Sequence, residues 1–377
     1  MDFSLSETQT DLIGLAKQIF EKELTLEGRK AAEQHGSFLT TTWSSVSEAG
    51  LAGMTFPEAR GGLGLSFLDA AIVLVEMGRA VAQIPLLQSA IAGVALEICD
   101  ANDAHSALAN DIASGHEILA IAAVEFGATD AKPLARATRS GDGWVVDGTW
   151  TGVSYACQAS TVLAAAQTDD GVLVFLADTN DPAITLTDEL ALNWEPQARV
   201  DAASLAVASG SVLSSGAAGE AAWDRIRQHL IVGMCAIGSG VAHEAVRQTA
   251  EYATNRMQFN RPIGSFQAVA QRLADAFVDA RGIELTMLQA ATHLAQGQNV
   301  PNEVATAKFW VAESGSRVGH AALHVHGGVS IDIDFPIHRY FLWAKQMEFG
   351  LGGATSQLVT IGRSLAATAP GLSEWHG

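Results

Sequence analysis

The chain has 377 residues, of which 48% are apolar and 17% are charged, and its formal net charge at pH 7 is −19. This composition indicates a compact globular protein with two or three domains and excludes an intrinsically disordered chain. It also argues against a nucleic-acid partner, because the sequence contains no basic stripe that would neutralise phosphates.

The spacing of apolar residues divides the chain into three segments. From Ser6 to about residue 117 the spacing is helical, and Ser6 with Gln9 forms a capping box. From about 118 to 217, short β-rich runs alternate with Asp-Gly and Asn-Asp turns, as in antiparallel hairpins. Helical spacing then returns. We predict an α+β fold with a helical N-terminal domain (1–117), a middle β domain (118–217) and a C-terminal helical bundle (218–377).

Targeting signals are not expected. The opening residues lack the basic and apolar regions of a signal peptide. The longest apolar run starts at Leu230 and is too short, and too interrupted by glycine and serine, for a membrane span. We therefore expect a cytoplasmic protein without a membrane partner.

One short stretch, NRMQFNRPIGSFQ at residues 255–267, combines features of a binding edge at a helix end. Arg256 would neutralise an anion, Phe259 would lie on a planar ring, and Gln267 would supply directional hydrogen bonds. The alternative is a solvated cation at a helix end, followed by an ordinary turn at Pro262.

A second stretch, LHVHGGVSIDIDFPIHRYFLWAK, runs from Leu323 to Lys345. Gly327 and Gly328 would let the backbone approach a ligand closely, and exposed amides beside a helix end attract phosphate oxygens. His324 and His326 flank the glycines. We do not expect a metal site, because no third histidine or carboxylate stands at ligand spacing.

The two stretches, together with the order of helical, β-rich and helical segments, resemble the acyl-CoA dehydrogenase family. The resemblance also covers the opening residues, the stretch from Gly50 to Ala80, the run from Arg256 to Asp275 and Lys308. It implies a C-terminal four-helix bundle and a tetramer around FAD, with each FAD site shared between neighbouring subunits. The residues that it assigns to the ADP half of FAD are Arg256, Phe259, Gln267, Gly327, Gly328 and His324, the last standing where the family usually has glutamine.

The catalytic base that the resemblance implies is missing. In most members a glutamate precedes GTSQ near the C-terminus, and here Gly353 takes its place in LGGATSQ. In a minority the glutamate lies 26 residues before the motif arginine, which gives Leu230 here. We expect no catalytic residue in this chain. Other candidates for the base are Glu348, Asp224 and His229, which we interpret as solvated surface residues.

The segments that line the flavin ring in the family also depart from its pattern. They read VEFGATDAKP (residues 124–133) and WTGVSYACQ (residues 150–158). Gly152 replaces the tryptophan that stacks on the ring, although Ser154 keeps a hydroxyl. Trp150 lies on the same strand face and would substitute only if the register slips.

These observations favour one subunit of a heteromeric acyl-CoA dehydrogenase. This chain would hold the ADP moiety of FAD, and a paralogous subunit in a heterotetramer would supply the carboxylate and the acyl-CoA pocket. The sequence of residues 324–346 resembles that of subunits of bacterial heterotetrameric enzymes that dehydrogenate steroid side-chain CoA esters. The alternatives are a non-catalytic structural or binding protein on the same scaffold, and a homotetramer with an unrecognised base.

Overall fold

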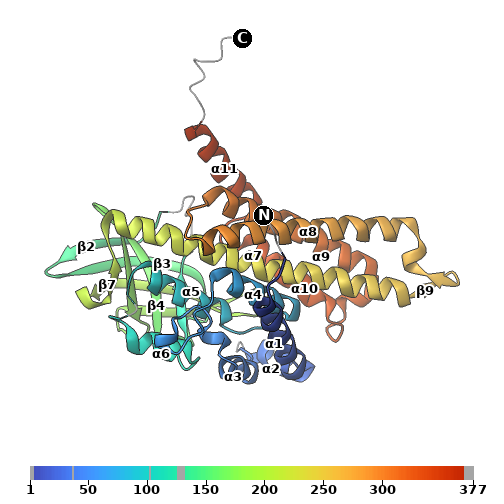
Figure 1. Ribbon diagram of the computed structural model, residues 1–377, viewed down its shortest axis with the longest axis horizontal. Helices are drawn as coiled ribbons and strands as arrows, with labels where there is room; N and C mark the ends of the chain where they lie inside the picture. The colour runs from blue at the N-terminus through green and yellow to red at the C-terminus, as the bar shows by residue number, and fades with distance from the viewer. Residues whose placement is uncertain (1–3, 36–37, 102, 125–131, 369–377) are drawn as a thin grey trace, which may run out of the picture.

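The structure, a computed structural model, describes residues 4–35, 38–101, 103–124 and 132–368. Helices at both ends of the chain pack together, and one β-sheet lies at one end of them (Figure 1). The predicted α+β architecture is therefore confirmed. The domain boundaries near residues 117 and 217 stay a prediction.

The N-terminal segment is helical, as predicted. In the capping box, the Gln9 amide donates to Ser6 Oγ over 3.1 Å and the Ser6 amide donates to Gln9 Oε1 over 3.0 Å. The helices of this segment are α1 (Glu7–Glu23), α2 (Leu26–His35), α3 (Thr40–Glu48), η1 (Leu51–Gly53), η2 (Glu58–Arg60), α4 (Phe67–Ala80), α5 (Leu86–Ile98) and α6 (Ser106–Ala113).

The middle segment forms an eight-stranded sheet with the order β6-β7-β3-β2-β4-β5-β8, in which β1 also pairs with β4. The predicted antiparallel hairpins are present as β2–β3, β4–β5 and β6–β7, whereas β1 and β2 pair with β4 in parallel. The strands are β1 (Leu119–Ala122), β2 (Arg136–Ser140), β3 (Gly143–Ser154), β4 (Thr161–Thr168), β5 (Gly171–Asp178), β6 (Ile184–Leu190), β7 (Pro196–Val207) and β8 (Val212–Ser214).

The C-terminal segment is a bundle built on one long helix. Its helices are α7 (Gly216–Asn255), α8 (Gln267–Ala295), α9 (Pro301–His326), α10 (Ile337–Phe349) and α11 (Ala354–Thr368). A continuous hydrophobic core joins this bundle to the N-terminal helices. Helices α4 and α7 approach closely at glycines: a Cβ on Gly240 would lie 1.9 Å from the Val75 carbonyl oxygen.

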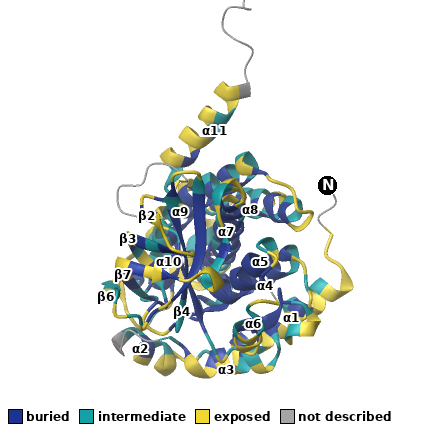
Figure 2. Cartoon of the chain, turned by 90° about the vertical axis from the view of Figure 1, so that its left-hand side faces the viewer, coloured by how far each residue is buried: buried dark blue, intermediate teal, exposed yellow. Residues whose placement is uncertain are grey.

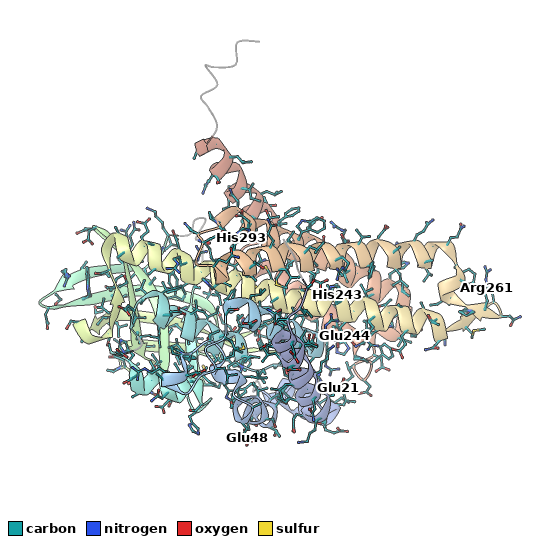
Figure 3. The ribbon with its side chains drawn as sticks, viewed as in Figure 1. Glu21, Glu48, His243, Glu244, Arg261 and His293 are labelled. Carbon is teal, nitrogen blue, oxygen red and sulfur yellow. The ribbon has the colours of Figure 1, made fainter. Side chains whose placement is uncertain are left out.

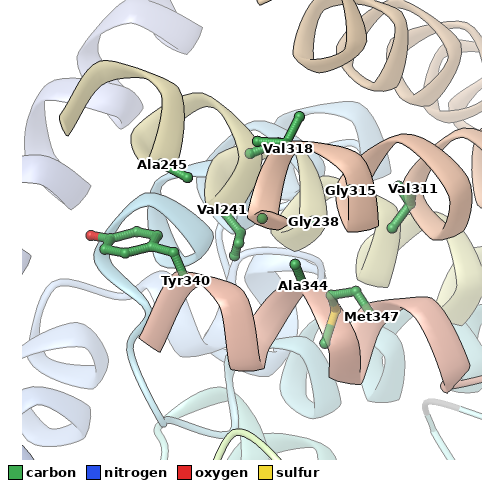
Figure 4. Close-up of a pocket in the computed structure, with 11 residues that line it drawn as sticks. Gly238, Val241, Ala245, Val311, Gly315, Val318, Tyr340, Ala344 and Met347 are labelled. Atoms are coloured by element: carbon green, nitrogen blue, oxygen red, sulfur yellow. The ribbon is translucent and has the colours of Figure 1, made fainter. Parts of the chain in front are cut away.

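Helix α7 explains the long apolar run in the sequence. By length and composition alone it would suit a membrane span, but 72% of its most apolar window is buried inside the fold, as in the core helix of a globular protein. Small residues on α7, α9 and α10 leave only a void of about 10 Å³ between these helices (Figure 4). This void is apolar and about the size of one water molecule, so it is not a ligand site.

Candidate functional site

The first predicted motif forms the end of the bundle that points away from the sheet (Figure 1). Arg256 directly follows α7, and a hairpin of β9 (Met257–Gln258) and β10 (Arg261–Pro262) leads toward α8. The turn residues Phe259 and Asn260 have φ angles of 50° and 62°, the backbone of a type I′ turn. The Phe259 ring at this tip is 87% exposed.

Two arginines on this hairpin have different surroundings. The guanidinium of Arg261 lies 4.1 Å from the centre of the Phe266 ring, and it projects at the end of the bundle (Figure 3). The Phe266 ring in turn meets Phe259 edge-on at 6.1 Å. Arg256 is exposed, and within the described part of the chain its side chain has no hydrogen-bond or ion-pair partner. Arg256 is therefore available to an external anion.

The second predicted motif lies at the same end of the bundle. The imidazole of His326, at the end of α9, stacks on Tyr252 of α7 with ring centres 4.4 Å apart, one helical turn before Arg256. His326 is buried, and its Nδ1 hydrogen-bonds the Ala322 carbonyl over 2.8 Å, so its role is structural. His324 is exposed.

The glycine pair lies beside a helix end, as the phosphate argument requires. Gly327 and Gly328 are exposed, and they follow the last turn of α9 and begin the short 3-10 helix η5 (Gly327–Ile331). Because the end of α9 is the negative end of its dipole, a phosphate here would depend on the glycine amides and not on the dipole of α9. That contact stays a prediction. Gly327 ends α9 with φ of 61° and ψ of −136°, a conformation that requires glycine.

The helix end that favours an anion here is the start of α8, which the sequence interpretation missed. This helix has 29 residues and begins at Gln267, which is exposed. Its N-terminus carries a partial positive charge. Arg256 and this helix start fit the pyrophosphate of a dinucleotide, and the exposed Phe259 ring fits a planar group. The roles of Arg256, Phe259, Gln267, His324, Gly327 and Gly328 stay predictions.

A separate cleft of about 790 Å³ lies between the sheet and the near end of the bundle. Its walls come from β1, β3 and β4, from the starts of α7 and α9, and from the first turns of α11. The charged side chains that line it, among the described residues, are Lys132, Asp224, Arg227 and Arg363. The volume is in the range of small-molecule sites.

Neither expected position for the base places a carboxylate in this cleft. Gly353 stands directly before α11, and a Cβ added to it would meet only the Glu348 carbonyl oxygen, at 3.8 Å. Leu230 is buried in the core. Asp224 is the one carboxylate that lines the cleft within the described chain. Asp224 is exposed, which agrees with its interpretation as a surface residue. Partial desolvation raises the pKa of its carboxyl, and the nearby Arg227 opposes this shift.

The other two candidates for the base have structural surroundings. His229 is buried and packs edge-on against Phe67 with ring centres 4.6 Å apart, so its interpretation as a surface residue is wrong. Burial lowers the pKa of this imidazole to about 4. Glu348 is partly buried and accepts a hydrogen bond from Lys345 over 2.8 Å.

Lys308, part of the resemblance, is fully buried beneath the end of α10. Its ammonium donates to the carbonyls of Met347 and Glu348 over 2.9 and 3.2 Å. These are among the last carbonyls of α10, which have no partner within the helix. Lys308 therefore fixes the chain just before Gly353.

The sheet wall of the cleft has an irregular strand. Between Trp150 and Val153, β3 contains a bulge in its pairing with β7, and Gly152 there has a φ of 62° and is exposed. Strict alternation therefore fails, and Trp150 lines the cleft while Gly152 does not. Ser154 accepts a hydrogen bond from Gln197 over 3.3 Å. Most of the stretch 124–133, namely residues 125–131, lies outside the described residues.

The bundle end and the cleft are far apart in one chain. Asp224 lies near the start of α7, and Arg256, 32 positions later, follows its last residue. At 1.5 Å per residue this separation is about 48 Å. One dinucleotide cannot contact both places in the same chain.

Comparison with known proteins identifies the family of the chain. Residues 6–101 match the acyl-CoA dehydrogenase N-terminal domain and residues 227–366 match the C-terminal domain. The acyl-CoA dehydrogenase FadE27 of Mycobacterium tuberculosis is 38% identical, covering 98% of this chain and all of FadE27. The structure is similar to a chain of the ChsE4–ChsE5 complex from M. tuberculosis, with 37% identity, a TM-score of 0.91 and coverage of 98% and 100%. It is also similar to the Tcur3481–Tcur3483 steroid ACAD, with 32% identity, a TM-score of 0.90 and coverage of 97% and 99%. The chain belongs to the acyl-CoA dehydrogenase family.

Proposed function

We propose that this chain is the ADP-holding subunit of a heteromeric acyl-CoA dehydrogenase. Its bundle end would bind the ADP half of FAD, the cofactor of the family, while a paralogous subunit brings the flavin-ring cleft and the catalytic carboxylate. The observation that carries the proposal is a separation of about 48 Å along α7. At one end lies the bundle end with Arg256 and the start of α8, and at the other lies a cleft with glycine at the base position.

Each residue at the bundle end has a definite task in this proposal. Arg256 neutralises the pyrophosphate together with the start of α8, and charge-assisted hydrogen bonds of this kind are stronger than neutral ones. Phe259 and the glycine pair contact the adenosine side. FAD, when bound, supplies the hydride acceptor. Removal of the α-proton of the thioester needs a carboxylate at the α-carbon, and this chain offers none at either expected position.

The relatives support the kinds of partner and substrate that we propose. Two solved structures similar to this chain, at 37% and 32% identity, each contain two named components, ChsE4–ChsE5 and Tcur3481–Tcur3483. The second of these is a steroid ACAD. We therefore propose a second acyl-CoA dehydrogenase subunit as the partner and a steroid side-chain CoA ester as the substrate.

The proposal is tested by purifying the tagged chain from its source organism and identifying the chains that accompany it. We expect a second acyl-CoA dehydrogenase chain with a carboxylate at the position of Gly353 or Leu230. The complex should be yellow and should reduce an artificial electron acceptor with an acyl-CoA substrate. Replacing the partner's carboxylate with its amide should abolish this activity, whereas full activity of a verified homo-oligomer would contradict the proposal.

Asp224 supports a second candidate, a homo-oligomeric dehydrogenase with an unusual base. It is the one carboxylate that lines the cleft within the described chain, and the pKa of its carboxyl is raised from the usual range. In that case the chain alone would turn over, and Asp224→Asn would lower the rate about 10²–10⁴-fold, the usual contribution of a general base. Under the heteromeric proposal the same substitution leaves the rate of the complex unchanged.

A further inference from the structure

Helix α2 is held against the body of the molecule mainly by charged side chains. It lies at the surface (Figure 2), and among its described side chains, residues 26–33, Ala32 is the one that is buried. The helix has ten residues, and a helix of this length is not stable alone in water. Its position therefore depends on the contacts that Arg29, Lys30 and Glu33 make.

Arg29 fixes α2 to the end of α4. Its guanidinium donates to the carbonyls of Ala80 and Val81 over 2.6 and 2.9 Å. The last carbonyls of a helix have no partner within it and carry a partial negative charge, so a cation is favourable there. One side of α2 is thus anchored in the N-terminal segment.

Glu33, one helical turn after Arg29, holds the start of α10. The Arg339 guanidinium donates to both Glu33 carboxylate oxygens, over 2.7 and 3.1 Å. The side chains of Arg339 and Glu33 are 5% and 14% exposed, so the pair is shielded from water. Lys30 forms a second ion pair with Asp334, which lies just before α10. A bidentate pair fixes orientation as well as distance, so α2 determines where α10 begins.

The segment that these ion pairs hold, residues 327–336, begins with the glycine pair and leads to α10. Its apolar side chains Ile331 and Ile333 are 85% and 69% exposed, so they add little packing. Phe335 lies against His326 at the end of α9, with ring centres 5.3 Å apart. The position of the segment between α9 and α10 therefore depends on Phe335 and on the ion pairs to α2.

We infer that Glu33 is a positioning residue of the ADP site, acting through Arg339 on the segment that carries Gly327 and Gly328. This inference depends on the proposed function, in which the glycine pair contacts the adenosine side of FAD. With the ion pair in place, the glycine amides are arranged before the cofactor binds. Without it, binding has to order the segment, and that cost lowers the affinity for FAD.

The test compares the dissociation constant of FAD among variants of the complex purified from the source organism. Glu33→Gln keeps the size of the side chain and removes its charge. The dissociation constant should rise about tenfold, because ordering about one backbone residue on binding has this effect. Asp279→Asn is the control, since it removes the carboxylate of a bidentate pair with Arg317 between α8 and α9, and the Asp279 side chain is also 14% exposed. It should leave the dissociation constant unchanged.

Arg339→Gln separates a positioning role from a general loss of stability. If Glu33 acts through Arg339, this change should also raise the dissociation constant of FAD about tenfold. The double variant with Glu33→Gln should then bind FAD no more weakly than either single variant. Additive rises would overturn the inference. An unchanged dissociation constant in Glu33→Gln, whatever its melting temperature, would also overturn it.

Lys30→Gln provides the test if Glu33→Gln prevents assembly of the complex. It breaks the more exposed pair with Asp334, and the dissociation constant of FAD should rise about twofold to fivefold, as for a surface ion pair. No rise contradicts the inference. Arg256→Ala in the same assay identifies a failure of the proposed function. If Arg256→Ala alone weakens FAD binding, the role of Glu33 is wrong; if it too has no effect, the bundle end is not the ADP site.

Discussion

Removing the side chain of Arg256 should weaken FAD binding without weakening the fold. Arg256 is exposed and has no partner within the described chain, so Arg256→Ala should change the free energy of unfolding by less than about 0.5 kcal/mol. A charge-assisted hydrogen bond to a pyrophosphate contributes about 1.5–3 kcal/mol. The dissociation constant of FAD should therefore rise about 10-fold to 100-fold.

Arg261→Ala is the matched control. It removes the same charge from the same hairpin, but the Arg261 guanidinium lies over the Phe266 ring. An exposed charge that makes no direct contact contributes less than about 1 kcal/mol, so the loss should stay below about fivefold. Flavin absorbance per assembled complex, measured after gel filtration and on serial dilution, gives both values. Equal losses from the two variants, or no loss from Arg256→Ala, would refute the assignment of Arg256.

Three further changes test separate parts of the account. Gly353→Glu has room for its Cβ. We nevertheless expect no dehydrogenase activity in the chain alone, because Gly152 stands where the resemblance places the tryptophan that stacks on the flavin ring, so a flavin would be poorly positioned. A large gain in initial rate would show an intact pocket. His229→Gln should remove part of the acid sensitivity of the fold. The pKa of His229 is lowered to about 4, so its stabilising contribution is complete above pH 6.5 and is lost as pH falls toward 4; melting temperatures that fall equally in variant and wild type contradict this. Gly315→Ala should stabilise the bundle by about 1 kcal/mol, since nothing lies within 4 Å of the added Cβ. Gly238→Ala should destabilise it, because the added Cβ would lie 2.8 Å from Val311. Chemical denaturation measures the free energy of unfolding of both variants.

Local patterns in the sequence predicted the fold well. The capping box at Ser6 and the hairpin β4–β5 depend on neighbouring residues, and both are present. The parallel pairing of β1 with β4 was not predicted, because it joins strands about 40 residues apart and no turn signal specifies it. The burial of His229 was missed for a similar reason, since Phe67, which covers it, comes from α4 in a different segment.

In the candidate site, too, the sequence predicted the local features and missed those that depend on tertiary contacts. The motif around Arg256 indicated an exposed binding edge, and the structure places Arg256, Gly327 and the start of α8 at one end of the bundle. Sequence spacing could not show that the glycine pair follows the negative end of α9. The bulge at Gly152 was also hidden, since it depends on the register between β3 and β7. The cleft joins the sheet to α7, α9 and α11, so only the tertiary fold reveals it.

The number of FAD molecules per chain in the native assembly tests the central claim most directly. If this chain contributes only a bundle end and its partner contributes the working cleft, each pair of chains holds one FAD. We therefore predict half a flavin per polypeptide in a complex that contains equal amounts of the two subunits. One flavin per polypeptide, in a homo-oligomer that turns over an acyl-CoA substrate, would contradict the account.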